Sequence, residues 1–572
     1  MKRTFITLVF LVLLSGPFMA GAVTYYTRVS GNWNALTTWS TVACGGAAAA
    51  VLPSATDDII VCVGTSVTVN VNATIANVTI SNGGTLQNGG GSTTNRSLTV
   101  TGILNVSAGG TLIQNSILNA STTLFAGTEV FSPTATLTVS NWSSRAVTLI
   151  TGLNSNLGHV NLNWSSGVLW WDNQGLGVVK TIQGNLTIGT SCQTFLDSTG
   201  AALAISIPGN LTVNGKLRVK NGTSGNAALL VNGNASLGAS GIFTGIYAGA
   251  GDFTFSVNNL VSVAGSTFNG LLDGHGNTGV SINGTFTCAG NFYGINAPAV
   301  MNNGVPDIQI NSLTYNGGTF MASCTHNLGG LATVNIISHA TVNFTIAADK
   351  IQLLGLSSLG GSNVTTRLNF TVGGNLTVGG LSTCELKTSE AYGEETVSVN
   401  GVFTSTAAKT LFNGGLTDAS GHKVKVSLGG YVISGGTVWF SENPSDTVLI
   451  TVNGNVQISG GVSILKSSTG YARMTVNGNF TQNLVGSLLY MHGPDQLGLA
   501  SAANDFADIR VNGNFTQSGG ILYFDNYDSP AEQRIYINGP SYTISNSATM
   551  ERAGYGTSSS FARIIFEYPG TV

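Results

Sequence analysis

Apolar and polar residues alternate along most of the chain, in short runs that turn at a glycine. The clearest copy spans residues 450–461 and reads I-T-V-N-G-N-V-Q-I-S-G-G. Such alternation places apolar side chains on one face of a half-buried β-strand and polar side chains on the other. In this copy we predict that six side chains point inward: Ile450, Val452, Val456, Ile458, Val462 and Ile464.

The phrase recurs at a nearly constant interval. Its corner glycine, or the residue in its place, occurs at positions 184, 209, 233, 259 and 284, then at 374, 401, 430, 454 and 478, and again at 513 and 539. The intervals within the first two groups are 24–29 residues. A propeller blade needs about 40 residues or more, and the consensus of a leucine-rich repeat is not visible. The period therefore predicts an all-β solenoid. A string of β-hairpins, which Asn-Gly also favours, is the alternative, but hairpins need no fixed period.

The corner residues and their neighbours predict two columns along the solenoid. We expect the corner glycines to adopt positive φ, so that Gly454→Val would strain the backbone. The asparagines after the corner would stack as a hydrogen-bonded ladder, at positions 185, 210, 234, 375, 455, 479 and 514. We also expect a row of hydroxyl side chains to face solvent. Contact with a ligand or the β-propensity of threonine would explain this row equally well. The row comprises Thr187, Thr212, Ser236, Thr287, Thr377, Thr404, Thr481 and Thr516.

Composition supports an all-β chain and limits the class of partner. Only 8% of the 572 residues are charged, whereas 77 are glycine. The formal net charge is −3, which argues against nucleic acid or an anionic membrane as the main partner.

The N-terminus resembles an export signal. Lys2 and Arg3 precede an apolar run from Phe5 to Leu14, and Ala20-Gly21-Ala22 supplies small residues for cleavage. We predict a signal peptide over residues 1–22, an N-terminal cap over 23–66, solenoid repeats over 67–550, and a last coil or truncated continuation over 551–572. No later run is long and apolar enough to span a membrane as a helix, so the expected location is secreted or on the outer cell surface.

The six cysteines fit an oxidising compartment and show no C-x-x-C metal spacing. Their separations allow disulfides between Cys44 and Cys62 and between Cys288 and Cys324. Isolated thiols buried in a β core are the alternative.

Candidate chemistry is sparse. Trp170 and Trp171 are adjacent, and successive side chains of a strand point to opposite faces, so one of the two indole rings leaves the core unless a loop covers it. An outward tryptophan ring near Trp164 could stack on a sugar ring. No acid group recurs at coil spacing with a basic partner, and the densest groups are Glu390, Glu394 and Glu395, then Asp505 and Asp508, then Asp525, Asp528 and Glu532. Asp525–Asp528 lacks the calcium-loop pattern, and His275 has no evident nucleophile beside it. We therefore assign no catalytic, cofactor-binding or metal-binding residue.

The cap and the repeats together resemble a known family. Ser30-Gly31-Asn32-Trp33, Thr38-Trp39-Ser40 and Asp57-Asp58-Ile59-Ile60 are similar to the start of large bacterial surface proteins exported by the type IX route. The V-N-G-N phrases are similar to those of their right-handed parallel β-helices, which are pectin-lyase-like. The resemblance implies an adhesive or structural protein and a C-terminal sorting domain, which is not visible here.

These observations lead to three hypotheses for function. The first is a non-enzymatic surface solenoid that displays loops to glycans, matrix proteins or cells. The second is a polysaccharide lyase or glycoside hydrolase, which would require several scattered acids and bases to meet in one groove. The third is an ice- or mineral-binding surface, which would require the hydroxyl row to form a flat array. We expect function where the repeat is interrupted, at residues 172–178, 295–306, 385–395 and 484–508.

Overall fold

The computed structural model has a nearly all-β fold, with parallel coils that form a right-handed β-solenoid. It describes residues 21–89, 96–115, 128–140, 157–163, 168–170, 180–197, 200–222, 224–297, 304–325, 331–344, 350–351, 353–355, 367–380, 383–385, 394–412, 423–442, 447–466, 471–492, 506–524, 532–545, 547–551 and 561–567. The predicted signal segment 1–22 therefore lies almost wholly outside the described residues. The chain divides into two compact units, one ending near residue 160 and the other beginning there.

The first unit contains two main stacks of parallel strands. One stack consists of β1 (Thr24–Thr27), β4 (Asp58–Val61), β7 (Asn77–Ile80), β10 (Ile103–Val106) and β12 (Thr128–Phe131). The other consists of β2 (Gly31–Asn32), β5 (Ser66–Val69), β8 (Thr85–Asn88), β11 (Thr111–Gln114) and β13 (Thr136–Val139). One coil in this unit places Asn77 beside Asp58, only 19 residues away. The expected coil length of 24–29 residues therefore does not hold here.

The cap residues of the first unit pack around two tryptophans. The rings of Trp33 and Trp39 lie edge to face with centroids 5.2 Å apart, and Trp39 Nε1 donates a hydrogen bond to the Trp33 carbonyl at 2.8 Å. A short 3₁₀ helix (Leu36–Thr38) and β3 (Trp39–Ser40) connect them to β1. The Cys44–Cys62 disulfide is confirmed, with a Cα–Cα distance of 6.0 Å.

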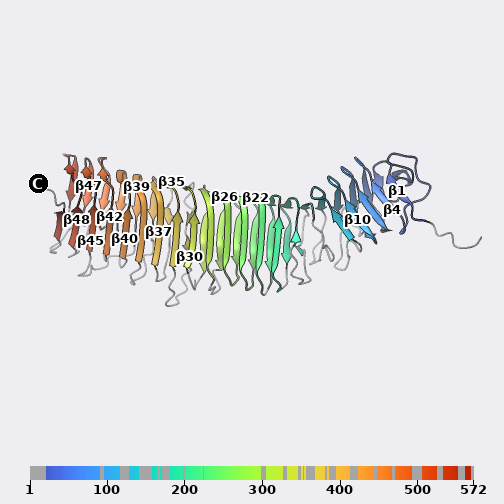
Figure 1. Ribbon diagram of the computed structural model, residues 1–572, viewed down its shortest axis with the longest axis horizontal. Helices are drawn as coiled ribbons and strands as arrows, with labels where there is room; N and C mark the ends of the chain where they lie inside the picture. Colours follow the sequence, from blue (N-terminus) through green and yellow to red (C-terminus); the bar gives the residue numbers. More distant parts are fainter. Residues whose placement is uncertain are drawn as a thin grey trace, which may run out of the picture. The chain divides into compact units, whose positions relative to one another are not determined.

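The second unit builds each coil from three strands, one in each of three parallel sheets. The first sheet is visible in Figure 1 as the row of strands toward the C-terminus, where β40 (Thr447–Val452), β42 (Tyr471–Val476), β45 (Phe506–Val511) and β48 (Glu532–Ile537) lie side by side. Earlier members of this sheet are β19 (Leu203–Ile207), β22 (Ala227–Leu237), β24 (Phe253–Ser262), β26 (Thr278–Cys288), β28 (Pro306–Tyr315), β30 (Leu331–Ile336), β34 (Arg367–Val372), β37 (Glu394–Ser405) and β39 (Lys423–Trp439). The last member is β51 (Phe561–Phe566).

The second and third sheets follow the first within each coil. Strands of the second sheet include β17 (Leu186–Ile188), β20 (Leu211–Val213), β31 (Ala340–Phe344), β35 (Leu376–Gly380), β43 (Phe480–Gln482), β46 (Phe515–Gln517) and β49 (Tyr542–Ile544). Strands of the third sheet include β18 (Gln193–Asp197), β21 (Lys216–Asn221), β23 (Ile242–Tyr247), β25 (Thr267–Leu272), β27 (Asn291–Ala297), β29 (Thr319–Thr325), β44 (Leu488–Tyr490), β47 (Gly520–Tyr523) and β50 (Ala548–Glu551). A single long strand, such as β41 (Val456–Ile464), can cross a corner and belong to both.

Stacked aromatic rings form part of the core. Phe243, Phe268, Phe292 and Phe320 follow one another on successive coils, with nearly parallel rings whose centroids are 4.8–4.9 Å apart. This distance equals the spacing of neighbouring strands in a sheet, so each ring contacts the rings above and below it.

Five of the six residues predicted to point inward are buried, and the sixth, Val462, is only partly buried against a cluster that contains Ile464. Ile450, Val452, Val456, Ile458 and Ile464 are all at most 2% exposed. After the Gly460-Gly461 pair, in which Gly461 adopts φ +70°, Val462 and Ile464 share one face of the strand and pack with Leu411, Trp439 and Tyr490. Ser463 lies on the opposite face and is buried. The hydroxyl of Ser463 is hydrogen bonded to the Tyr431 hydroxyl at 2.8 Å.

Glycine is required at the corners for a reason other than the predicted positive φ. None of the described positive-φ glycines is Gly454 or Gly478. Instead, Gly478 N–H donates to the Gly454 carbonyl of the preceding coil at 3.0 Å. A Cβ at position 478 would lie 2.5 Å from that carbonyl oxygen and 2.5 Å from Asn455 Oδ1. Close stacking of corners, rather than backbone conformation, excludes a side chain.

The asparagine ladder exists, with a different bonding pattern from the one predicted. Asn210 N–H donates to Asn185 Oδ1 at 2.8 Å, and Asn479 N–H donates to Asn455 Oδ1 at 2.9 Å. The side-chain oxygen therefore accepts from the backbone of the next coil. A second ladder joins side-chain amides directly, through Asn453, Asn477, Asn512 and Asn538.

Replacing Gly478 by alanine tests the stacked corner. We expect Gly478→Ala to destabilise the second unit by about 1–3 kcal/mol, because the added methyl group must displace a neighbouring backbone carbonyl. Gly435→Ala is the matched control, since a Cβ there would meet nothing closer than 3.9 Å. Denaturant unfolding of both variants measures the difference, and equal stabilities would contradict the steric explanation.

Candidate binding surface

The outward positions of the first sheet change character toward its C-terminal end. In β24 and β26 they carry Thr254, Ser256 and Ser281, whereas β42, β45, β48 and β51 carry arginines, acids and aromatic rings. We name this surface the arginine–aromatic face, and its members are Tyr471, Arg473, Phe506, Asp508, Arg510, Glu532, Arg534, Tyr536 and Arg563. Cross-strand register brings them together, since Arg473 pairs with Asp508, Asp508 with Arg534, and Arg534 with Arg563.

Asp508 holds two of the arginines in place. Its side chain is completely buried, and Arg473 Nε lies 2.8 Å from Oδ1 and 3.0 Å from Oδ2. Arg510 Nε lies 3.2 Å from Oδ2. The hydrogen bond with Asp508 raises the pKa of the Arg473 guanidinium above its ordinary value. A carboxylate buried between two cations on neighbouring strands fixes where both guanidinium planes lie.

Aromatic rings support the same guanidinium groups. Arg534 lies over Phe506 at 4.9 Å, Arg510 over Tyr536 at 4.5 Å, and Arg473 over Tyr471 at 5.3 Å. The rings of Tyr471 and Phe506 stack on one another with centroids 5.5 Å apart. Cations over ring faces are attracted by the ring quadrupole, so these contacts restrict the arginines without neutralising their charge.

The face keeps a net positive charge and remains accessible. Four arginines accompany two acids, and Glu532 pairs with both Arg534 and Arg563. The side chains of Arg473, Arg510, Arg534 and Arg563 are 36%, 35%, 30% and 58% exposed. A cationic surface is therefore presented by a chain whose formal net charge is −3.

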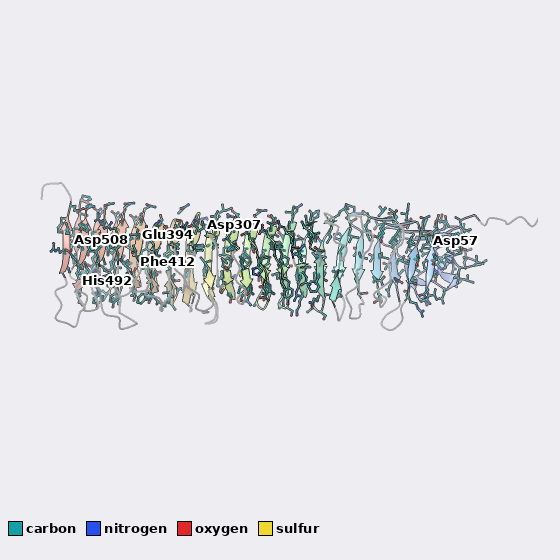
Figure 2. All side chains as sticks on the ribbon, turned by 90° about the horizontal axis from the view of Figure 1, so that it is seen from below. Asp57, Asp307, Glu394, Phe412, His492 and Asp508 are labelled. Atoms are coloured by element: carbon teal, nitrogen blue, oxygen red, sulfur yellow. A yellow bond between two sulfur atoms is a disulfide. The ribbon has the colours of Figure 1, made fainter. Side chains whose placement is uncertain are left out.

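Charged residues continue on the same sheet toward the N-terminus. Glu394 on β37 forms an ion pair with Lys425 on β39, and Lys423 precedes it at the next outward position. The hydrogen bond from Lys425, together with nearby cations, lowers the pKa of Glu394 although partial burial opposes the shift. Figure 2 shows Asp307, Glu394 and Asp508 one after another along the second unit.

A shallow trough occupies an earlier part of the first sheet. Its volume is about 380 Å³, and its lining includes the small outward residues Ala204, Ala228 and Gly279 together with Leu230, Asp307 and Gln309. Ala204 and Ala228 lie on neighbouring strands, and Gly279 lies on the far side of Thr254 of β24 in the same row, so small outward residues on three of these four strands leave the hollow.

The structure separates the acids that the sequence grouped by proximity. Glu394 points outward and Glu395 is fully buried, while Asp508 and Glu532 meet on the arginine–aromatic face. Asp508 has basic partners on its own strand and on the adjacent coil, but Arg473 is 35 residues away, so this pairing does not fall at the regular spacing to which the expectation referred. Glu390, Asp505, Asp525 and Asp528 lie outside the described residues, and so does Trp171 together with the side chains of Trp164 and Trp170.

Three of the predicted interruptions contain strand residues, since the segment 295–306 includes the end of β27 and the first residue of β28. The segment 484–508 includes β44 and the first residues of β45, and the segment 385–395 includes the start of β37. Sequence reasoning missed the arginine–aromatic face because Arg473 and Asp508 are 35 residues apart, well beyond the regular period. Counting backward from the corner glycines at 478 and 513 would have aligned them.

The side chains of His492, His275 and Cys288 do not contribute to this face; His492 and Cys288 are buried and His275 is exposed. His492 lies on the other side of the unit from Asp508 in Figure 2, and burial together with the nearby Lys466 charge lowers its pKa to about 3. His275 pairs through its backbone with Ala250. Cys288 is buried outside any disulfide, so the Cys288–Cys324 pairing is wrong, and burial raises the pKa of its thiol.

Within the described ranges, no cluster of three or more histidine, cysteine, aspartate or glutamate side chains could hold a metal ion. The same ranges contain no helix with the length and apolar character needed to cross a membrane. Comparison with known proteins finds neither a family model nor a curated protein that matches the chain.

Proposed function

We propose that this chain is a non-enzymatic structural and adhesion protein of the outer cell surface or the secreted fraction, in which a solenoid presents a binding face to glycans, matrix or cells. The observation that carries the proposal is the arginine–aromatic face, where four guanidinium groups are held by Asp508, by Glu532 and by three rings. Fixed, accessible donors on a repetitive sheet are suited to binding an extended partner.

Two features support an extracellular location. The Cys44–Cys62 disulfide is typical of an oxidising compartment, and residues 1–22 have the pattern of a signal peptide. The resemblance of the cap to surface proteins of the type IX route and of the coils to pectin-lyase-like β-helices agrees with this location.

Binding of the purified chain to glycan arrays and whole bacterial cells tests the proposal. We expect saturable binding by the chain from Val23 onward, with no consumption of the bound glycan. Thr481→Ala, which alters the second sheet, should leave binding unchanged. Consistent failure to bind across a broad array and several cell types would overturn the proposal.

A polysaccharide lyase is the second candidate, because Asp508 and Glu532 meet four arginines on one face. Against it, both oxygens of Asp508 already accept from arginines and its side chain is buried. Ultraviolet absorbance of unsaturated sugar products distinguishes this candidate, since β-elimination creates a conjugated double bond. Accumulation of such products would replace the adhesion proposal.

The hydroxyl row offers less support for an ice- or mineral-binding role. It forms a single outward column, because strands such as β17, β20 and β46 carry only one outward residue between two buried ones. Val261 and Val432 interrupt the column. A flat two-dimensional array would need at least two adjacent columns.

A further inference from the structure

We propose that the arginine–aromatic face binds an acidic polysaccharide, namely a polymer that carries one carboxylate on each sugar. This inference rests on the proposed function and specifies its ligand class. It follows from three properties of the face: the spacing of its arginines, the donors that they leave available, and the low density of its charge.

The spacing comes from the strand order. β42, β45, β48 and β51 are consecutive in the first sheet, and each carries one arginine on the outward surface, in the order Arg473, Arg510, Arg534 and Arg563. Neighbouring strands are about 4.8 Å apart. The Cα atoms of the four arginines therefore advance along the solenoid by one strand spacing at a time, which is comparable to the length that one sugar ring adds to a chain. Arg510 lies one outward position further along its strand than the column of the other three arginines.

The available donors come from the way Asp508 is bound. Arg473 and Arg510 both engage Asp508 through Nε, while each side chain stays about a third exposed. The terminal nitrogens of Arg473 and Arg510 are then the donors that face a ligand. Arg534 already donates its terminal nitrogens to the Tyr536 hydroxyl and to Glu532, so it contributes mainly its charge. Two parallel N–H groups match a carboxylate, which can accept both at once.

The charge density favours a polysaccharide over nucleic acid. Duplex DNA carries one charge per about 1.7 Å of its axis, whereas this face offers one arginine per strand spacing. Asp508 and Glu532 lie among the arginines and would repel a dense row of phosphates. A polymer with one carboxylate per sugar can place its charges on the arginines and its neutral hydroxyl groups near the two acids.

Equilibrium binding of the purified chain to an unbranched polyglucuronate tests the inference, with the fully methyl-esterified polymer as the neutral counterpart. We expect binding to the acidic polymer that weakens as salt is raised and is at least about tenfold weaker for the ester, because each esterified sugar loses charge-assisted hydrogen bonds. Duplex DNA at the same salt concentration should bind more weakly than polyglucuronate.

The variants remove arginines while keeping Asp508 paired. R534Q/R563Q should weaken polyglucuronate binding about tenfold or more. R534K/R563K should bind more weakly than the wild type and more tightly than the glutamine variant, because lysine keeps the charge but loses the planar fork. K423Q/K425Q is the matched control, since it removes the same charge from the same sheet and should bind as the wild type does. R563Q alone alters the most exposed arginine of the four. This single variant keeps the inference testable if the double variant fails to fold.

The outcomes separate the inference from the proposed function. Equal binding of the acidic and esterified polymers, tighter binding of DNA, or equal losses in R534Q/R563Q and K423Q/K425Q would overturn the inference. If the chain still binds neutral glycans or cells in any of these cases, the adhesion proposal stands. Binding to none of the glycans and cells would overturn both.

Discussion

Replacing Asp197 by alanine should destabilise the second unit by about 3–5 kcal/mol, because it leaves a lysine ammonium buried without its counter-ion. Lys220 Nζ lies 3.2 Å from Asp197 Oδ2, and the two side chains are 1% and 6% exposed. Lys220 also donates to the Ala201 carbonyl. That single neutral acceptor does not compensate for the lost carboxylate.

Substituting both partners is expected to be far less costly. Register places Asp197 and Lys220 in one inward column of the third sheet, followed by Ile246, Leu271 and Ile295 on the next coils. Asp197→Leu with Lys220→Ile extends this apolar column, and we expect stability within about 1 kcal/mol of the wild type or above it. Hydrogen exchange of residues 193–221, with denaturant unfolding, measures both variants. Similar losses in the single and double variants would show that the ion pair itself supplies the stability.

The sequence predicts the architecture because the repeat is enforced by stacking. Corner glycines at a fixed interval, with alternating runs on either side, are consistent with coils of similar perimeter, and the observed register confirms this for Thr187, Thr212 and Ser236. The reason for glycine at the corner was not predictable from one copy of the phrase. It depends on the carbonyl of the coil below, as Gly478 and Gly454 show, and that neighbour is 24 residues away.

The binding face was not predicted, for a related reason. Arg473, Asp508 and Arg534 become neighbours only when the coils are aligned across a longer insertion between β44 and β45. In the sequence, Asp505 and Asp508 fall within the predicted interruption at residues 484–508. Alignment by the corner glycines would have placed Asp508 on a strand between two arginines.

The face and the buried pair show two uses of charge in a chain that has little of it. Asp197 and Lys220 are both buried and could be replaced by the residues that follow them in the column. Asp508 is buried as well, but its arginine partners reach the surface. A buried acid that orients exposed cations does more for binding than for stability, which is why the arginines and not Asp508 are the residues to vary in a binding experiment.

The stability of the first unit should fall as the pH rises from about 4.5 to about 7, because of one inward glutamate. Glu129 on β12 is 8% exposed, and it continues the column of Ile59, Val78 and Leu104. Burial raises its pKa to about 7 from an ordinary value of 4.5. The folded state then binds this proton more tightly than the unfolded state, so the stabilisation is present below pH 4.5 and is lost progressively up to pH 7.

Glu129→Gln should remove this dependence and stabilise the unit at pH 8 by up to about 3 kcal/mol, since the amide mimics the protonated acid. Asp57 supplies a contrast of opposite sign in the same unit. Although burial opposes it, hydrogen bonds from Ser54 and from the Val23 N–H lower the pKa of Asp57, so Asp57→Asn should destabilise the unit at neutral pH. Hydrogen exchange of residues 98–106 between pH 5 and pH 8 follows both variants. An unchanged pH dependence in Glu129→Gln would show that Glu129 is ionised at no cost in the folded unit.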